Sequence, residues 1–161
     1  SRYDYSLTTP FRFMAGVAYQ YEKLAIVSVD YEFVDYRTSR FAKRNADWVS
    51  NANEAIKYSF KSASNIRLGG ELRLSKFYLR GGYGYYGRPF DPEEDNFELD
   101  YRTISGGAGF REQNFAIDFG FSNMKSSEKY ILYTSSLGSP VADISSQKNI
   151  FTVSFSYKFG Y

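Results

Sequence analysis

The sequence predicts an all-β fold, an antiparallel transmembrane β-barrel, from three observations. Apolar and polar residues alternate with a period of two over most of the chain, as in strands with one apolar and one polar face. The 161 residues include 16 Tyr, 15 Phe and 1 Trp, although the mean hydropathy is only −0.46. Such aromatic enrichment is typical of proteins that place rings at a membrane–water interface. No run of 18 apolar residues is present, so a transmembrane helix is not expected.

The composition also restricts the chemistry. The chain has no Cys and no His, so thiol nucleophiles, His-based catalytic sites and most metal sites are excluded. Asp30 and Glu32 share a strand face, but nothing places a third catalytic group beside them, so we expect no enzyme and no cofactor. The net charge of +2, without a Lys/Arg cluster, argues against a nucleic-acid partner.

The segment 149–161 shows the alternation most clearly. Its apolar or aromatic positions are Phe151, Val153, Phe155, Tyr157, Phe159 and Tyr161. Such a strand is long enough to cross a bilayer at a tilt, which takes about 9–11 residues. The same pattern predicts six further strands, over residues 11–21, 24–36, 65–74, 77–86, 101–111 and 114–126.

Short and long connections alternate between these strands. Short turns are expected at 22–23, 75–76 and 111–114. Long segments are expected at about 37–63, 87–98 and 127–147. Outer-membrane barrels have short periplasmic turns and long outer loops, so we expect residues 1–161 to form one barrel segment whose long segments lie outside. Within the first of them, Asn51 followed by Glu54 is an N-cap pattern that predicts a short helix near 52–60.

Seven is an unusual strand count, because bacterial single-chain barrels have an even number. Backbone groups at an open edge cannot stay unpaired in lipid. We therefore expect this chain to be a fragment of a barrel whose remaining strands lie in a separate polypeptide. The alternative is an eighth strand at 129–134, which we interpret instead as an extension of the strand that starts near 114.

Two strand–turn–strand units carry a family resemblance. Ile66-Arg-Leu-Gly-Gly-Glu-Leu-Arg-Leu74, a short turn and Leu79-Arg-Gly-Gly-Tyr-Gly-Tyr-Tyr86 resemble a unit near the end of the FadL/TodX-type outer-membrane hydrocarbon transporters. Ser105-Gly-Gly-Ala-Gly-Phe110 with Phe115-Ala-Ile-Asp-Phe119 is similar to the hairpin that follows, and the Phe- and Tyr-rich composition suits a Bacteroidetes member.

The resemblance implies half of a 14-stranded barrel in the bacterial outer membrane. This chain would supply the C-terminal barrel wall, and an N-terminal half would supply the other strands and a plug. The cargo would be hydrophobic small molecules such as long-chain fatty acids. The expected partners are therefore outer-membrane lipid, the N-terminal half, the cargo and the barrel-assembly machinery.

Candidate site residues follow from the strand faces. The polar face, expected to line the lumen, carries Arg67, Glu71, Arg73, Arg80, Arg111 and Asp118. A cationic group there can hold a fatty carboxylate, with Arg67 and Arg80 as the first choices, or the charges can form cross-strand ion pairs. Glycines of the same phase can leave room for a passage or a plug, or can simply curve the wall. The terminal aromatics resemble the signal that the assembly machinery reads: Phe155, Tyr157, Phe159 and Tyr161.

Two other fold hypotheses fit the alternation. The first is a complete eight-stranded barrel of the OmpA/OmpX class with a structural or adhesion role. The second is a soluble β protein that binds lipids. Residues 129–134 as a separate strand would favour the first, and stable behaviour without detergent would favour the second.

Overall fold

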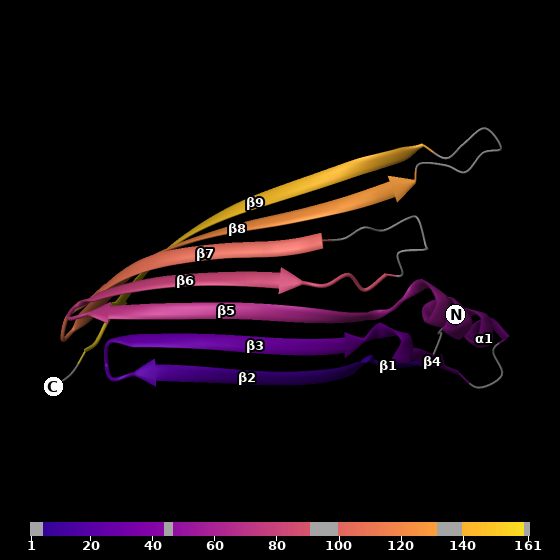
Figure 1. Cartoon of the computed structure of the whole chain (residues 1–161), viewed down its shortest axis with the longest axis horizontal. Helices are drawn as coiled ribbons and strands as arrows, with labels where there is room; N and C mark the ends of the chain where they lie inside the picture. Colours follow the sequence, from indigo (N-terminus) through magenta and orange to yellow (C-terminus); the bar gives the residue numbers. More distant parts are fainter. Residues whose placement is uncertain (1–4, 44–46, 91–99, 132–139, 160–161) are drawn as a thin grey trace.

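The structure, a computed structural model, describes residues 5–43, 47–90, 100–131 and 140–159. Seven strands form one antiparallel sheet in chain order, each paired with the next of the seven (Figure 1). They are β2 (Phe11–Tyr21), β3 (Ala25–Asp35), β5 (Ser62–Leu74), β6 (Phe77–Tyr86), β7 (Asp100–Arg111), β8 (Phe115–Ile131) and β9 (Val141–Tyr157). The sheet is twisted and curved but open, with β2 and β9 at its two edges.

One end of the sheet consists of the short turns. Two of these turns place a non-glycine residue in the left-handed region, Glu22 at φ 47° and Ser75 at φ 57°. The amide of Leu24 donates to the carbonyl of Tyr21 across the first turn, at 3.1 Å. Such tight reversals fix the register of the hairpins and therefore the face on which each side chain lies.

The other end carries a small layer of its own, built on the connection from β3 to β5. It holds η1 (Tyr36–Thr38), β4 (Arg40–Ala42), which pairs with β1 (Ser6–Thr8), and α1 (Asp47–Ser59). The side-chain amide of Asn53 in α1 accepts from the amide of Phe41 and donates to its carbonyl, at 2.8 and 3.0 Å. Trp48 packs its ring against Phe41 at 5.8 Å. Figure 1 places this layer at the opposite end from the C-terminus.

The prediction of seven strands is confirmed, and several boundaries are corrected. The last strand runs 141–157 instead of 149–161, and β8 continues to 131, so strands occupy much of the expected loop at 127–147. Residues 129–131 extend β8, as we expected, and do not start an eighth strand; 132–134 lie outside the described residues.

The outer segments are corrected as well. The helix begins at Asp47, so Asn51 lies inside it and is not its N-cap; the N-terminal turn forms earlier than the sequence pattern indicated. The segment 37–63 holds η1, β4 and α1, and only 87–90 of the loop at 87–98 is described. The loop positions 87–89 are not in a strand.

Candidate functional site

The register gives the sheet one continuous apolar face. Cross-strand partners point to the same side, so the rows can be followed from β2 to β9. Large apolar side chains on this face are exposed on every strand: Val17 is 69% exposed, Phe151 78% and Phe155 67%. Among the described residues, only Val34 and Ala63 are buried apolar residues. The part of the sheet that the structure describes therefore has almost no internal core, and its apolar side chains are exposed.

The apolar side chains of this face form a band that runs diagonally across the strands, here called the belt. On β2 the belt begins at Phe11, and on β9 its first apolar residue is Phe151. The cross-strand pairs place Phe151 in the same row as Tyr19, which lies eight residues below Phe11 on β2. Eight residues rise about 26 Å and six strand spacings cover about 29 Å, so the belt lies about 40° off the rows. Strands inclined at ~40° to the normal of a horizontal layer have this geometry, and transmembrane barrel strands tilt by about 35–45° from the barrel axis.

Aromatic rings follow both edges of the belt. At the turn end, Phe77 contacts Phe110, and Phe110 contacts Phe115, with ring centroids 5.3 and 5.9 Å apart. The same edge continues to Tyr157 and Phe159, whose centroids are 4.7 Å apart. At the upper edge, Phe121 and Phe151 pair at 5.0 Å. Rings of this kind at both limits of an apolar band are the pattern of an aromatic girdle.

The polar face carries a first ionic cluster around Glu32 of β3. This carboxylate is 6% exposed. It accepts from Nδ2 of Asn65 at 3.1 Å, and it forms ion pairs with Nε of Arg12 at 3.1 Å and Nη1 of Arg67 at 3.6 Å. Two guanidinium groups and one amide thus compensate one buried carboxylate, as a buried charge requires.

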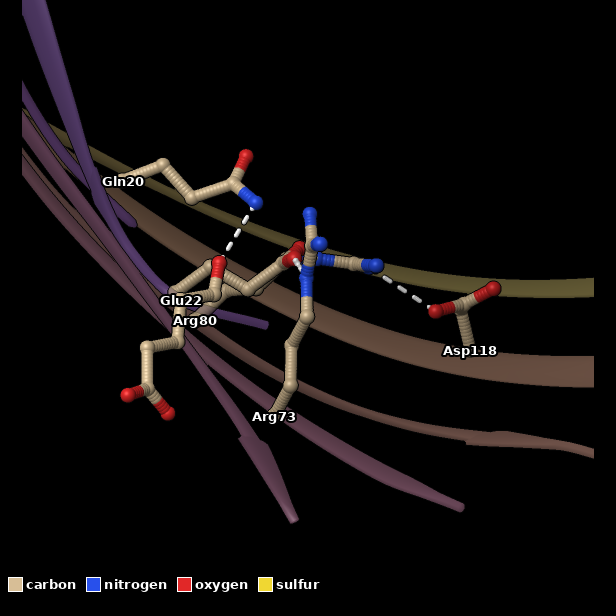
Figure 2. A network of polar contacts seen from close by, with 6 residues as sticks. Gln20, Glu22, Arg73, Arg80 and Asp118 are labelled. Atoms are coloured by element: carbon tan, nitrogen blue, oxygen red, sulfur yellow. Dashed lines mark hydrogen bonds and ion pairs between the residues drawn. The ribbon is translucent and has the colours of Figure 1, made fainter. Parts of the chain in front are cut away.

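A second ionic cluster lies nearer the turn end (Figure 2). Glu71 of β5 accepts from Nε of Arg73 and from Nε of Arg80, each at 2.6 Å. Arg80 also donates through Nη1 to Asp118 of β8, at 2.8 Å. Because Arg80 lies on β6, this network ties together three strands across the polar face.

Three arginines of this second cluster surround one ring. The guanidinium carbons of Arg73, Arg80 and Arg111 lie 6.0, 5.8 and 4.5 Å from the ring centroid of Tyr78. A guanidinium within about 6 Å of an aromatic face is attracted to it. Three cations therefore meet two carboxylates, Glu71 and Asp118, and the cluster has an excess of donors for an anion.

Three Gly-Gly pairs lie side by side in the middle of the sheet, at 69–70, 81–82 and 106–107. Gly69 pairs with Gly82, and Gly81 pairs with both Gly70 and Gly106. On the apolar face, Gly70, Gly81 and Gly106 form one row without side chains across β5, β6 and β7, whereas on the polar face the row of Gly69 and Gly82 continues to Ser105. A Cβ on Gly81 would meet nothing within 4 Å, whereas one on Gly107 would lie 2.8 Å from the carbonyl oxygen of Phe119.

Two hollows lie over this glycine patch on the polar face. One, of about 470 Å³, reaches from Arg80 to Thr152 and is floored by Gly107 and Gly120. The other, of about 420 Å³, lies on the opposite side of Arg80, against Ser28 and Gly69. The small side chains create the space, and Arg80 borders both hollows.

A third charged pair lies at the outer rim, beyond the belt. Both oxygens of Asp35, the last residue of β3, accept from the Arg37 guanidinium, at 2.9 and 3.0 Å. The hydrogen bonds from Arg37 hold the pKa of Asp35 below its usual value, and the carboxylate raises the pKa of Arg37. Asp35 is also the N-cap of η1.

The structure brings five of the six predicted polar-face residues together. Glu71, Arg73, Arg80 and Asp118 share hydrogen bonds and Arg111 joins them at Tyr78, whereas Arg67 lies with Glu32. The sequence analysis missed Tyr78 and Glu32 as cluster centres. Both residues lie on the same strand face as the named arginines, so the period-2 alternation of the sequence could have indicated them. The alternative of cross-strand ion pairs is confirmed; contact with a cargo stays a prediction.

The terminal aromatics are placed in part. Phe155 and Tyr157 lie on the apolar face of β9, Phe159 follows the strand, and Tyr161 lies outside the described residues. Their role as an assembly signal stays a prediction.

The described part of the chain lacks two further features. It contains no group of three or more Asp or Glu placed to hold a metal ion. None of its helices has the length and apolarity needed to cross a bilayer. In the comparisons with known proteins, no protein-family model matches this chain, and no curated protein matches it.

Proposed function

We propose that this chain forms part of the wall of an outer-membrane β-barrel that passes hydrophobic small molecules, such as long-chain fatty acids. The diagonal belt is the observation that carries the proposal. Its width along β2, from Phe11 to Tyr21, is about 33 Å along the strand and about 25 Å once the strand is tilted by 40°, the height of a lipid-facing band. In this orientation the apolar face meets lipid and the polar face meets the lumen.

The polar face supports a passage for molecules that have an apolar body and an acidic group. The two hollows beside Arg80 offer room lined by glycine and small side chains. The arginines around Tyr78 offer donors for a carboxylate. The FadL/TodX resemblance of 66–86 and 105–119 suggests the same class of cargo. Since β2 and β9 are open edges, further strands are needed to close the barrel.

A pair of neighbouring substitutions on β2 tests the membrane orientation. Val17→Arg places a charge in the middle of the belt, and Ala18→Arg places the same charge on the polar face. A lipid-facing Arg costs about 2–4 kcal/mol near the bilayer midplane, so V17R should abolish heat-modifiable, membrane-embedded protein, whereas A18R should fold. Equal behaviour of the two variants, or a wild type that stays monodisperse without detergent, would refute the proposal.

The transport activity needs a separate assay. The full-length protein is reconstituted into vesicles, and entry of radiolabelled oleate is measured against glucose as a polar control. We expect the protein to accelerate oleate entry and to leave glucose entry unchanged. If the protein is folded and membrane-embedded but does not accelerate oleate entry, the transport proposal fails. A structural or adhesion role would then be supported.

A further inference from the structure

A further hollow lies at the turn end of the polar face, next to the second ionic cluster. Its volume is about 270 Å³, and it is bordered by the turn 112–114 and by the turn-end residues of β7, β8 and β9. Asp118 borders both this turn-end hollow and the hollow of about 470 Å³ that is floored by Gly107 and Gly120. The two hollows therefore adjoin at one residue.

Two cations border the turn-end hollow, Arg111 and Lys158. Within the described part of the chain, the polar contact of the Arg111 guanidinium is with the ring of Tyr78, 4.5 Å from its centroid. A guanidinium on a ring face keeps its in-plane N–H donors for an acceptor. The backbone amide of Lys158 donates to the carbonyl of Asn114 at 2.8 Å, which holds the residue at the hollow. Its side chain is exposed and has no ion pair or hydrogen bond with a described residue.

The two acids that line the turn-end hollow are each paired with a cation outside it. Asp118 accepts from Nη1 of Arg80 at 2.8 Å, and Glu112 accepts from Nζ of Lys76. Neither Arg80 nor Lys76 lines this hollow. With both acids compensated from outside, the lining keeps a net positive charge from its own two cations.

Neutral donors lie between these two cations. Ser156 is in the same cross-strand row as Arg111, with Ala116 between them. Two strand spacings separate the outer members of this row, or about 10 Å, and Lys158 follows two residues further on the same side. The side chains of residues 113 and 114 line the hollow as well and can donate hydrogen bonds. A small anion such as a carboxylate can therefore accept from both cations across this gap.

We propose that the turn-end hollow binds the carboxylate of the acidic cargo while its apolar body lies in the adjoining hollow over Gly107 and Gly120. The inference rests on the proposed function and adds the place of the acid group and the orientation of the cargo. Ile150 gives the larger hollow an apolar side chain, and its glycine floor leaves room for an acyl chain. Arg80 borders that hollow but already donates to two carboxylates, so the available donors lie at the turn end. The cargo therefore lies with its acid group toward the turn end.

Two exposed lysines of the polar face give a matched test. Lys158→Gln removes a cation from the turn-end hollow, and Lys148→Gln removes one from the same face of β9 outside the hollow. The full-length protein in detergent is titrated calorimetrically with oleate and with oleyl alcohol, which has the same apolar body without the acid. We expect K158Q to weaken oleate binding about fivefold and to leave oleyl alcohol binding unchanged. K158R should bind both compounds like the wild type, and so should K148Q.

Equal oleate affinity in K158Q and K148Q would overturn the inference, and so would an equal loss of oleate and oleyl alcohol binding in K158Q. Oleate entry into vesicles is measured on the same variants. Transport by the wild type without a binding difference between K158Q and K148Q contradicts this inference alone, whereas a binding difference without transport contradicts the proposed function alone. Heat-modifiability is measured on each variant, so that a failure of the membrane fold is recognised separately.

Discussion

The two ionic clusters of the polar face differ in what lies at their centre. In the first, one carboxylate, Glu32, is enclosed by Arg12, Asn65 and Arg67. In the second, the centre is a neutral ring, Tyr78. Cations outnumber carboxylates by one in each cluster, two to one in the first and three to two in the second. In the first cluster both cations face the one buried carboxylate, so we expect it to hold strands together. In the second the Arg111 guanidinium lies over the ring, so we expect this cluster to be able to hold an anionic guest as well.

The largest expected effect breaks the first cluster. Glu32→Gln leaves two guanidinium groups facing a neutral amide, so we expect a loss of about 2–4 kcal/mol in the free energy of unfolding. Glu71→Gln should cost less, about 1 kcal/mol, since Arg80 keeps Asp118 and the Glu71 side chain is more exposed. Urea unfolding in lipid vesicles measures both, and a larger loss for E71Q would reverse the assignment.

A second comparison concerns the glycine patch. Gly107→Val forces a side chain against the backbone of β8, so we expect a loss of about 1–3 kcal/mol. On the apolar face, a Cβ at Gly81 meets nothing within 4 Å, so Gly81→Val should change stability by less than about 0.5 kcal/mol. The same unfolding assay compares the two variants, and equal losses would show that the space above Gly81 is filled.

The third prediction sharpens the difference in guest binding. Arg111→Gln removes the cation nearest to Tyr78 without breaking the Glu71–Arg80–Asp118 network, so oleate binding should weaken about five- to tenfold, or ~1 kcal/mol, at nearly unchanged stability. Arg12→Gln should do the opposite, with lower stability and unchanged oleate affinity. Isothermal titration and urea unfolding on both variants separate the two roles, and an unchanged affinity in R111Q would remove the second cluster from the passage.

The smallest effect lies at the rim, where Asp35 is charged and partly exposed. Its pKa is lowered in the folded state, so its stabilisation is present above its usual pKa and is lost as the pH falls through the folded-state value. Asp35→Asn should therefore cost a few tenths of a kcal/mol at pH 7 and nothing in strongly acidic buffer. Unfolding midpoints of the two proteins across this range check the sign; a gap that widens in acid would contradict it.

The strands were predictable because one period-2 signal extends through all seven of them, and the alternation fixes which residues share a face. The extension of β8 to 131 agrees with our interpretation of 129–134, whereas the start of β9 at Val141 was not predicted, because residues 141–148 are mostly polar on both faces and give no alternation. Hydrogen bonding to β8, which the sequence period does not report, keeps them in the sheet. The start of α1 was predicted too late, because the pattern of Asn51 and Glu54 indicated an N-cap at Asn51. In the structure the helix begins at Asp47.

For the candidate site, the sequence indicated which charges share a face but not which of them meet. Glu71 and Arg80 are nine residues apart and pair across one hairpin, whereas Arg80 and Asp118 are 38 apart and meet only through the register of two further strand pairs. Arg67 has the same phase as Arg73 but lies six residues further from the turn end, which is why it joins Glu32 instead.

The glycine patch also has a mechanical meaning. Side chains on the two faces of a sheet normally stiffen it, because bending presses neighbours together on the inner side. In the row of Gly70, Gly81 and Gly106 no side chains on the apolar face resist such bending, so we expect the sheet to bend more easily there than in rows that carry side chains. In the membrane barrel that we propose, we therefore expect the curvature to change first at β5–β7, beside the arginines, and the width of the proposed passage to respond to the tension of the surrounding bilayer.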